Sequence, residues 1–115
     1  MKLTILALGL FSTSVFATHY CDGKVNNLAI SSHGNVHANI GTLGEGHTIC
    51  NVNHKVGDFS PESCKAMYSL LLSAEASQKN LRVYFKNDSD KSCKKSSWKS
   101  LPSSAYGLYY IRMSR

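Results

Sequence analysis

Histidines are the most obvious candidates for chemistry in this sequence, because they bind metal ions and act as general bases. Five are present, all in the first half of the chain, at positions 19, 33, 37, 47 and 54. The spacing of His33 and His37 would suit one face of a helix, but a turn-forming Gly34-Asn35 pair lies between them. We therefore predict no metal site and no cofactor.

Nucleophilic catalysis needs a serine or cysteine beside a base and an orienting group. The sequence has no Gly-x-Ser-x-Gly motif, and its seven carboxylates are scattered without an evident acid–base pair. Gly41, Gly44 and Gly46 precede a β-like run rather than a helix, which argues against a phosphate-binding loop. We expect a protein that is not an enzyme.

The N-terminus has the pattern of an export signal. A positive Met1-Lys2 start precedes an apolar stretch over residues 3–11, and Val15-Phe16-Ala17 provides a cleavage site. The apolar stretch is shorter than the ~20 residues that a bilayer-spanning helix needs. We predict a signal peptide over residues 1–17 and a secreted or periplasmic protein that does not span the membrane.

Four cysteines follow this signal, and none belongs to a Cys-x-x-Cys pair. An even number in an oxidising compartment predicts disulfides, which a chain this small needs as staples, but the count alone leaves three connectivities. We favour Cys50–Cys64, which would join a β-like run to the start of the expected helix. The partner bond is then Cys21–Cys93, between the beginning of the mature chain and a late loop.

Short alternating runs separated by glycine-containing turns fill the first part of the mature chain. The runs cover residues 22–32, 36–40 and 47–52. Period-two alternation between turn signals is typical of an antiparallel meander of three strands.

A helix is predicted next. Ser60 is a suitable N-cap, Pro61 suits the first helical position, and Glu62 favours the positive end of the helix dipole. No glycine or proline follows until after Ser77. At 100° per residue, one broad apolar arc contains Cys64, Met67, Tyr68, Leu70, Leu71, Leu72 and Ala74.

This arc is wider than one buried stripe requires. Either the helix packs in a deep groove of its own domain, or it also contacts the same helix of another subunit. On the second alternative we assign Tyr68 and Leu72 to the intersubunit contact. Glu75 then lies near a water-filled channel between the helices.

The last third of the chain contains two more strand signals. Residues 81–85 alternate, residues 86–104 are polar and loop-like, and residues 106–113 are rich in aromatic and β-branched types. The resulting order is β-β-β-α-β-β. We therefore predict a mainly β fold with one helix, a five-stranded OB-fold barrel forming a single domain over residues 18–115.

The whole chain has a formal net charge of +6, and its basic residues are concentrated at the end. Nine lie in residues 79–115, against only Asp88 and Asp90. Such a region either binds an anionic partner or is a solvated loop. Residues suited to a single-strand groove are Arg82, Tyr84, Lys86, Trp98, Tyr109 and Arg112. An exported protein rarely meets such a strand, so we expect no nucleic-acid partner.

Three segments together resemble a known family: Thr48-Ile49-Cys50-Asn51, residues 60–78, and Leu81-Arg82-Val83-Tyr84-Phe85-Lys86. They are similar to the B subunits of bacterial AB-type toxins, in particular the subtilase cytotoxin B subunit. They are also similar to small exported bacterial proteins of unknown role that share a Cys-Asn-x-Asn, helix, Arg-Val-Tyr core. The likeness covers most of the mature chain.

The resemblance implies an OB barrel, a homo-oligomeric ring of five subunits and glycan binding. Asp22-Gly23 looks like the acidic start of the family's first strand, and the sugar-contacting serine and tyrosine of the family fall at Asn26 and Phe85. Our expected ligand-binding set consists of Asp22, Asn26, Phe85 and Lys86.

The expected function is that of an exported, non-enzymatic binding module for a cell-surface glycan or another anionic ligand. The alternative is an exported inhibitor of a host or competitor hydrolase, because small disulfide-stapled domains often have that role.

Overall fold

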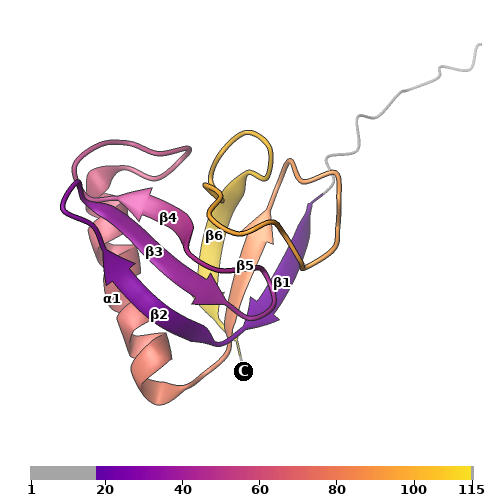
Figure 1. The fold of residues 1–115 in the computed structure, drawn as a ribbon, viewed down its shortest axis with the longest axis horizontal. Coiled ribbons are helices and arrows are strands. Elements are labelled where there is room, and N and C mark those ends of the chain that lie inside the picture. Colours follow the sequence, from indigo (N-terminus) through magenta and orange to yellow (C-terminus); the bar gives the residue numbers. More distant parts are fainter. Residues whose placement is uncertain (1–17, 115) are drawn as a thin grey trace, which may run out of the picture.

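The computed structural model describes residues 18–114 (Figure 1). The predicted signal peptide over residues 1–17 lies outside these described residues. In chain order the elements are β1 (His19–Gly23), β2 (Val25–Ile30), β3 (Asn35–Ile40), β4 (His47–Asn51), α1 (Pro61–Ser77), β5 (Leu81–Phe85) and β6 (Leu108–Met113).

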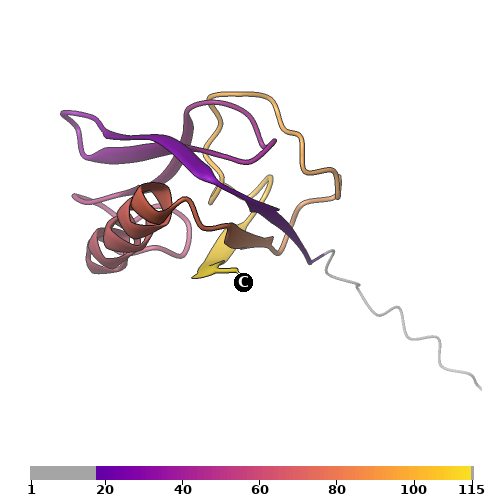
Figure 2. The same ribbon diagram turned by 90° about the horizontal axis from the view of Figure 1, so that it is seen from below.

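The strands form two separate antiparallel sheets of three strands each. Sheet I has the order β1-β5-β6, and sheet II has the order β2-β3-β4. Sheet II lies in front of α1 in Figure 1, and the view from below in Figure 2 shows the helix along one side of this sheet. The core lies between the helix and the inner faces of the two sheets.

The predicted five-stranded OB barrel is wrong, although the mainly β composition with one helix is confirmed. The single first strand expected over residues 22–32 is two strands, because the chain leaves sheet I after Gly23 and enters sheet II at Val25. Backbones cross closely at this point, where a Cβ atom on Gly23 would lie 2.3 Å from the Cα atom of Gly41. A side chain at position 23 would push β1 and β3 apart.

Closure of a barrel also fails at the other side of sheet II. The outer edge of β4 is bonded by a loop: the Thr48 N–H donates to the carbonyl of Lys99 at 2.9 Å, and the Leu101 N–H donates to the carbonyl of Thr48 at 3.0 Å. No strand of sheet I pairs with β4 in the part of the chain that the structure describes. The described residues therefore form two open sheets.

The helix begins where the sequence predicts. Ser60 is the N-cap, and its hydroxyl accepts a hydrogen bond from the Ser63 N–H at 3.1 Å. One stripe is buried, and it consists of Cys64, Met67, Leu71 and Ala74. The helix packs against β2, β4 and β6. Within residues 18–114 no helix has the length and apolar character that crossing a bilayer requires.

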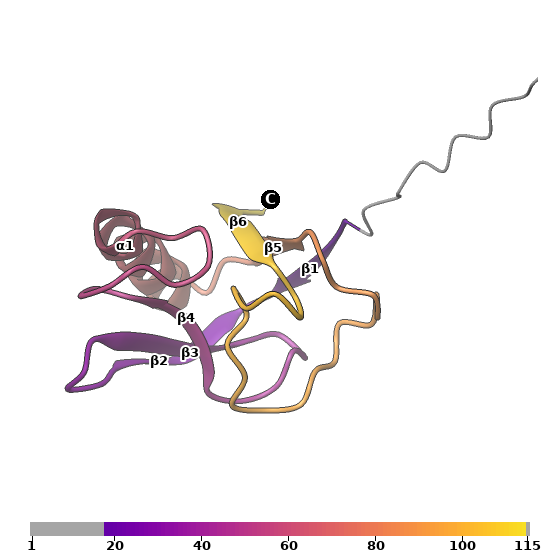
Figure 3. The same ribbon diagram turned by 90° about the horizontal axis from the view of Figure 1, so that it is seen from above.

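The segment of residues 86–107 joins β5 to β6 without a helix or strand of its own and runs past one end of sheet II (Figure 3). We call it the long loop. Its Cys93 is bonded to Cys21 of β1, with 5.7 Å between the Cα atoms. The second disulfide joins Cys50 of β4 to Cys64 of α1, with 5.5 Å between the Cα atoms. The structure therefore has the two cysteine pairs that we predicted.

The buried stripe of the helix generates a stability prediction. Leu71 is fully buried, and Ser69, two residues earlier on the opposite side of the helix, is exposed. Leu71→Ala should lower the free energy of unfolding by about 2–5 kcal/mol, because it leaves a cavity in the core. Ser69→Ala should change it by less than about 0.5 kcal/mol. Urea denaturation followed by circular dichroism measures both, and similar losses in the two variants would contradict the assigned buried face.

Candidate functional site

The outer face of sheet I carries a row of tyrosines, one from each strand. Tyr20 of β1 pairs in register with Tyr84 of β5, which pairs with Tyr110 of β6. The ring centroids are 5.6 Å and 5.2 Å apart along the row. Because Cys21 and Val83 point into the core, their strand neighbours must point outward. Half of the surface of Tyr20 and of Tyr110 is exposed to solvent.

A β-bulge adds a fourth tyrosine to this row. The register of β5 and β6 shifts so that Tyr84 pairs with Tyr110 and Phe85 pairs with Leu108, which leaves Tyr109 without a partner. The ring of Tyr109 lies 6.4 Å from the rings of both Tyr84 and Tyr110. Two consecutive residues of β6 therefore expose aromatic rings.

Two arginines lie beside the tyrosines. Arg82 binds Asp22 through two hydrogen bonds, Nε to Oδ1 at 2.7 Å and Nη2 to Oδ2 at 2.9 Å, and its guanidinium lies 4.0 Å from the centre of the Tyr20 ring. Arg112 is the register partner of Arg82, and its Nε donates to the Tyr84 hydroxyl at 3.3 Å.

A guanidinium has five N–H donors. Arg112 makes no other side-chain hydrogen bond within the described residues, so most of its donors face solvent. We call this surface the tyrosine–arginine face; it consists of Tyr20, Tyr84, Tyr109, Tyr110, Arg82, Arg112 and Asp22.

The pKa values on this face follow from the arginines. The hydrogen bond from Arg82 lowers the pKa of Asp22, and partial burial opposes that effect. The hydrogen bond from Arg112 lowers the pKa of the Tyr84 phenol, with a smaller contribution from Arg82. Both groups are shifted toward their anionic forms, so the face favours negative charge.

The structure brings only part of the expected ligand-binding set to this face. Asp22 lies on it, and Lys86 borders it, with its Nζ 6.0 Å from the ring centre of Tyr109 and 2.5 Å from Oδ2 of Asp58. Phe85 is fully buried, so its ring does not reach the surface. Asn26 is exposed on the outer face of sheet II instead.

The residues assigned to an oligomer interface lie on the helix, away from sheet I. Leu72 is 51% exposed, whereas Tyr68 and Glu75 are half-buried. One oxygen of Glu75 accepts a hydrogen bond at 3.3 Å from the N–H of Leu28, in the irregular part of β2. Glu75 therefore has a partner within its own chain, while the intersubunit contact of Tyr68 and Leu72 stays a prediction.

A charged cluster is buried beneath the long loop. Asp88 pairs with Lys95, and its Oδ2 lies 2.7 Å from Nε2 of His19. Only 3% of the side-chain surface of Asp88 and of Lys95 is exposed. The donor atoms of His19, Cys21 and Cys93 lie within 4.8 Å of one another, but the two sulfurs are joined in a disulfide and do not supply metal-binding thiolates. The cluster therefore attaches the long loop to β1.

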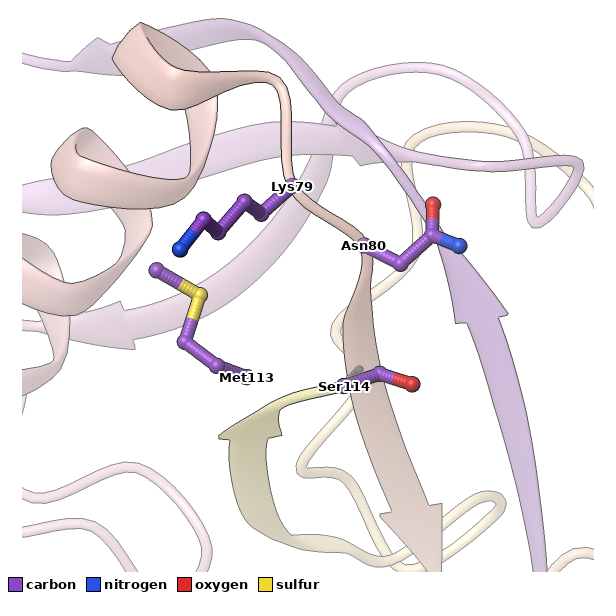
Figure 4. A pocket seen from close by; sticks show the side chains of 4 residues that line it. All are labelled: Lys79, Asn80, Met113 and Ser114. Atoms are coloured by element: carbon purple, nitrogen blue, oxygen red, sulfur yellow. The ribbon is translucent and has the colours of Figure 1, made fainter.

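A hollow of about 470 Å³ lies near the ends of β6 and α1 and is lined by Lys79, Asn80, Met113 and Ser114 (Figure 4). The Lys79 and Asn80 side chains extend in different directions. These polar groups do not converge on one point, so the hollow offers no catalytic or ligand-orienting set.

No family model matches the chain, and no curated protein or solved structure matches it. These comparisons supply no link to toxin B subunits. The functional argument therefore depends on the geometry of the described residues.

The sequence analysis did not single out Tyr20 or Tyr110. For β5 the available signal was strand alternation, because Tyr84 lies between the apolar Val83 and Phe85. No alternation was predicted for residues 106–113, so Tyr110 had no such signal. Tyr20 was missed because the first strand was predicted to begin only at residue 22, whereas β1 begins at His19.

The Asp22–Arg82 pair predicts a pH dependence of stability. Since the pKa of Asp22 is lower in the folded state, the pair stabilises the fold above the ordinary aspartate pKa of about 3.9. This stabilisation is lost as the pH falls through the folded-state pKa. Asp22→Asn should therefore lose less stability than the wild type between neutral pH and acid, as measured by urea midpoints.

The matched control is Glu45→Gln, because Glu45 is exposed and makes no ion pair within the described residues. Its acid dependence should follow that of the wild type. An Asp22→Asn variant with the full wild-type dependence would show that the ion pair contributes nothing in solution.

Proposed function

We propose that this protein is an exported, non-enzymatic binding module that holds acidic carbohydrate on the tyrosine–arginine face. The observation that carries this proposal is the row of exposed tyrosines beside an arginine with free donors. A contiguous exposed patch of this many aromatic rings is rare on monomeric proteins and marks a site that binds a partner.

The tyrosines suit a sugar ring. The C–H side of a pyranose is apolar and packs on an aromatic ring, while the phenolic hydroxyls accept and donate hydrogen bonds at the rim. Tyrosine also loses little side-chain freedom on binding, since it has two χ angles. The three rings from β1, β5 and β6 pack against one another and so form one continuous aromatic surface rather than isolated side chains.

The arginines favour an acidic sugar over a neutral one. Arg82 is already neutralised by Asp22, whereas Arg112 retains donors in the fork geometry that matches a carboxylate or sulfate. The lowered pKa of Tyr84 indicates the same local preference for negative charge. A carboxylated or sulfated sugar would thus place its ring on the tyrosines and its anion at Arg112.

The location is part of the proposal. Two disulfides indicate an oxidising environment. Together with the predicted export signal, they support secretion or a periplasmic location, and a secreted protein has access to cell-surface glycans. A homo-oligomer would raise the avidity of a shallow face.

Binding of acidic and neutral oligosaccharides to the immobilised protein tests this function. The wild type should prefer carboxylated or sulfated glycans. Tyr110→Ala should weaken their binding about tenfold, or ~1.4 kcal/mol, through loss of one stacked ring. Arg112→Gln should remove most of the preference for acidic over neutral sugars. Ser69→Ala, on the distant helix surface, is the matched control and should bind as the wild type does.

Two results would contradict the proposal. One is the absence of any acidic-glycan binding by the wild type. The other is retention of that binding in a Tyr110→Ala, Arg112→Gln double variant. Capture of a hydrolase that loses activity on binding, without glycan binding, would support the inhibitor alternative.

A further inference from the structure

We infer a second binding site on the outer face of sheet II, centred on Trp98, that takes the ring of a neutral saccharide. This site lies on different strands from the tyrosine–arginine face and does not depend on the function proposed for it. We call it the tryptophan site; it consists of Trp98, His37, Asn39, Asn26 and Thr48.

Trp98 is unusual in both exposure and backbone conformation. Its side chain lies on the long loop, and the residue is 73% exposed. Its φ angle is +62°, in the left-handed region that bulky residues rarely adopt. A strained backbone that holds a large aromatic ring in water is not explained by stability, and such outliers point to function.

The indole is nevertheless held in place. It rests on Gly46, where a Cβ atom would lie 2.2 Å from Cζ3 of the ring, so only glycine leaves room for it. The backbone N–H of Trp98 donates to the carbonyl of Glu45 at 2.8 Å, and the backbone N–H of Glu45 donates to the Ser97 hydroxyl at 3.0 Å. A ring fixed before binding loses little freedom when a ligand stacks on it.

Two polar side chains are oriented by the same glycine. Nδ1 of His37 lies 3.2 Å from the carbonyl of Gly46, which places the proton on Nδ1 and leaves Nε2 as an acceptor. Oδ1 of Asn39 accepts from the Gly46 N–H at 2.8 Å, so the Asn39 amide NH₂ is left as a donor. Neither Nε2 of His37 nor Nδ2 of Asn39 has a partner among the described residues.

These groups lie together on one surface. The His37 ring is edge-on to the Trp98 ring, with centroids 6.5 Å apart. Asn39 pairs in register with Asn26, and His37 pairs with Thr48, so all four side chains belong to the outer face of sheet II. Val36, Ala38 and Ile40 alternate with them and are buried.

The chemistry of the site matches an uncharged polyol. It combines one flat aromatic surface with amide, imidazole and hydroxyl groups, and none of its five side chains carries a fixed charge. An anion would find no cation within the site, and an apolar ligand would bury free amide donors without partners. A neutral sugar ring needs no cation and leaves no amide donor without a partner, because its C–H side stacks on the indole while its hydroxyls bond to the amides.

Trp98 provides its own test, because it is the one tryptophan in the sequence. Its emission and its quenching by acrylamide report on this site alone. Titration of the full chain with methyl glycosides of glucose, galactose, mannose and N-acetylglucosamine should give, for at least one of them, a saturable change in emission and protection from acrylamide. Asn39→Ala, which keeps the fluorophore, should weaken that binding about tenfold or more.

Calorimetry with Trp98→Ala should show loss of the same binding, and circular dichroism should show a retained fold because the side chain is mostly exposed. Tyr110→Ala is the control and should leave the tryptophan signal unchanged, which separates this site from the tyrosine–arginine face.

The inference fails if none of these glycosides alters or protects Trp98 emission, whatever acidic glycans do at sheet I. It also fails if Asn39→Ala binds as tightly as the wild type. Loss of a captured protein partner in Trp98→Ala, without any glycoside response, would instead assign Trp98 to a protein interface and overturn the saccharide site.

Discussion

The covalent link from Cys21 to Cys93 is the constraint on which both exposed faces depend. The long loop is polar and contributes few apolar side chains, so burial alone does not hold it against the sheets. The disulfide fixes its middle to β1, and the buried Asp88 adds contacts to Lys95 and His19. Without these attachments, β1 would be held in sheet I by β5 alone, and the long loop would be held to sheet II only by the hydrogen bonds of its second half.

The buried polar groups around this link have partners. Every buried side-chain nitrogen and oxygen in the described residues is hydrogen-bonded, so the charged cluster does not leave an uncompensated group inside. His19 also stacks on Phe85, with centroids 5.3 Å apart, and thereby joins the cluster to the apolar core. The loop is therefore docked by covalent, ionic and apolar contacts that meet at the first strand.

Capping residues and strand alternation predicted the helix and most strands of the fold. They did not predict which strands pair with one another. The helix from Pro61 and the strand Leu81–Phe85 depend on capping and on period-two alternation, which are readable in a short window. The sheet order depends on where the chain changes sheet, and the crossing of Gly23 over Gly41 involves residues that alternate like a single strand. The predicted barrel assumed that this strand was continuous.

The same limit applies to the sites. Burial of Asp88 was not predictable, since an aspartate in a lysine-rich stretch is ordinarily solvated. Expectation of a ligand at Phe85 came from resemblance, while its alternation with Val83 already indicated a core position. The tyrosine row required knowledge of two strand registers at once, β1 with β5 and β5 with β6, because its members are distant in sequence.

The bulge at Tyr109 affects how this surface can change by insertion or deletion during evolution. Leu108 already pairs with Phe85 and Tyr110 with Tyr84, so loss of the single codon for Tyr109 would leave every other pair of β5 and β6 in its present register. The number of aromatic rings on sheet I is thus open to change by a one-codon insertion or deletion. Elsewhere in a regular strand the same event would turn every downstream side chain to the opposite face.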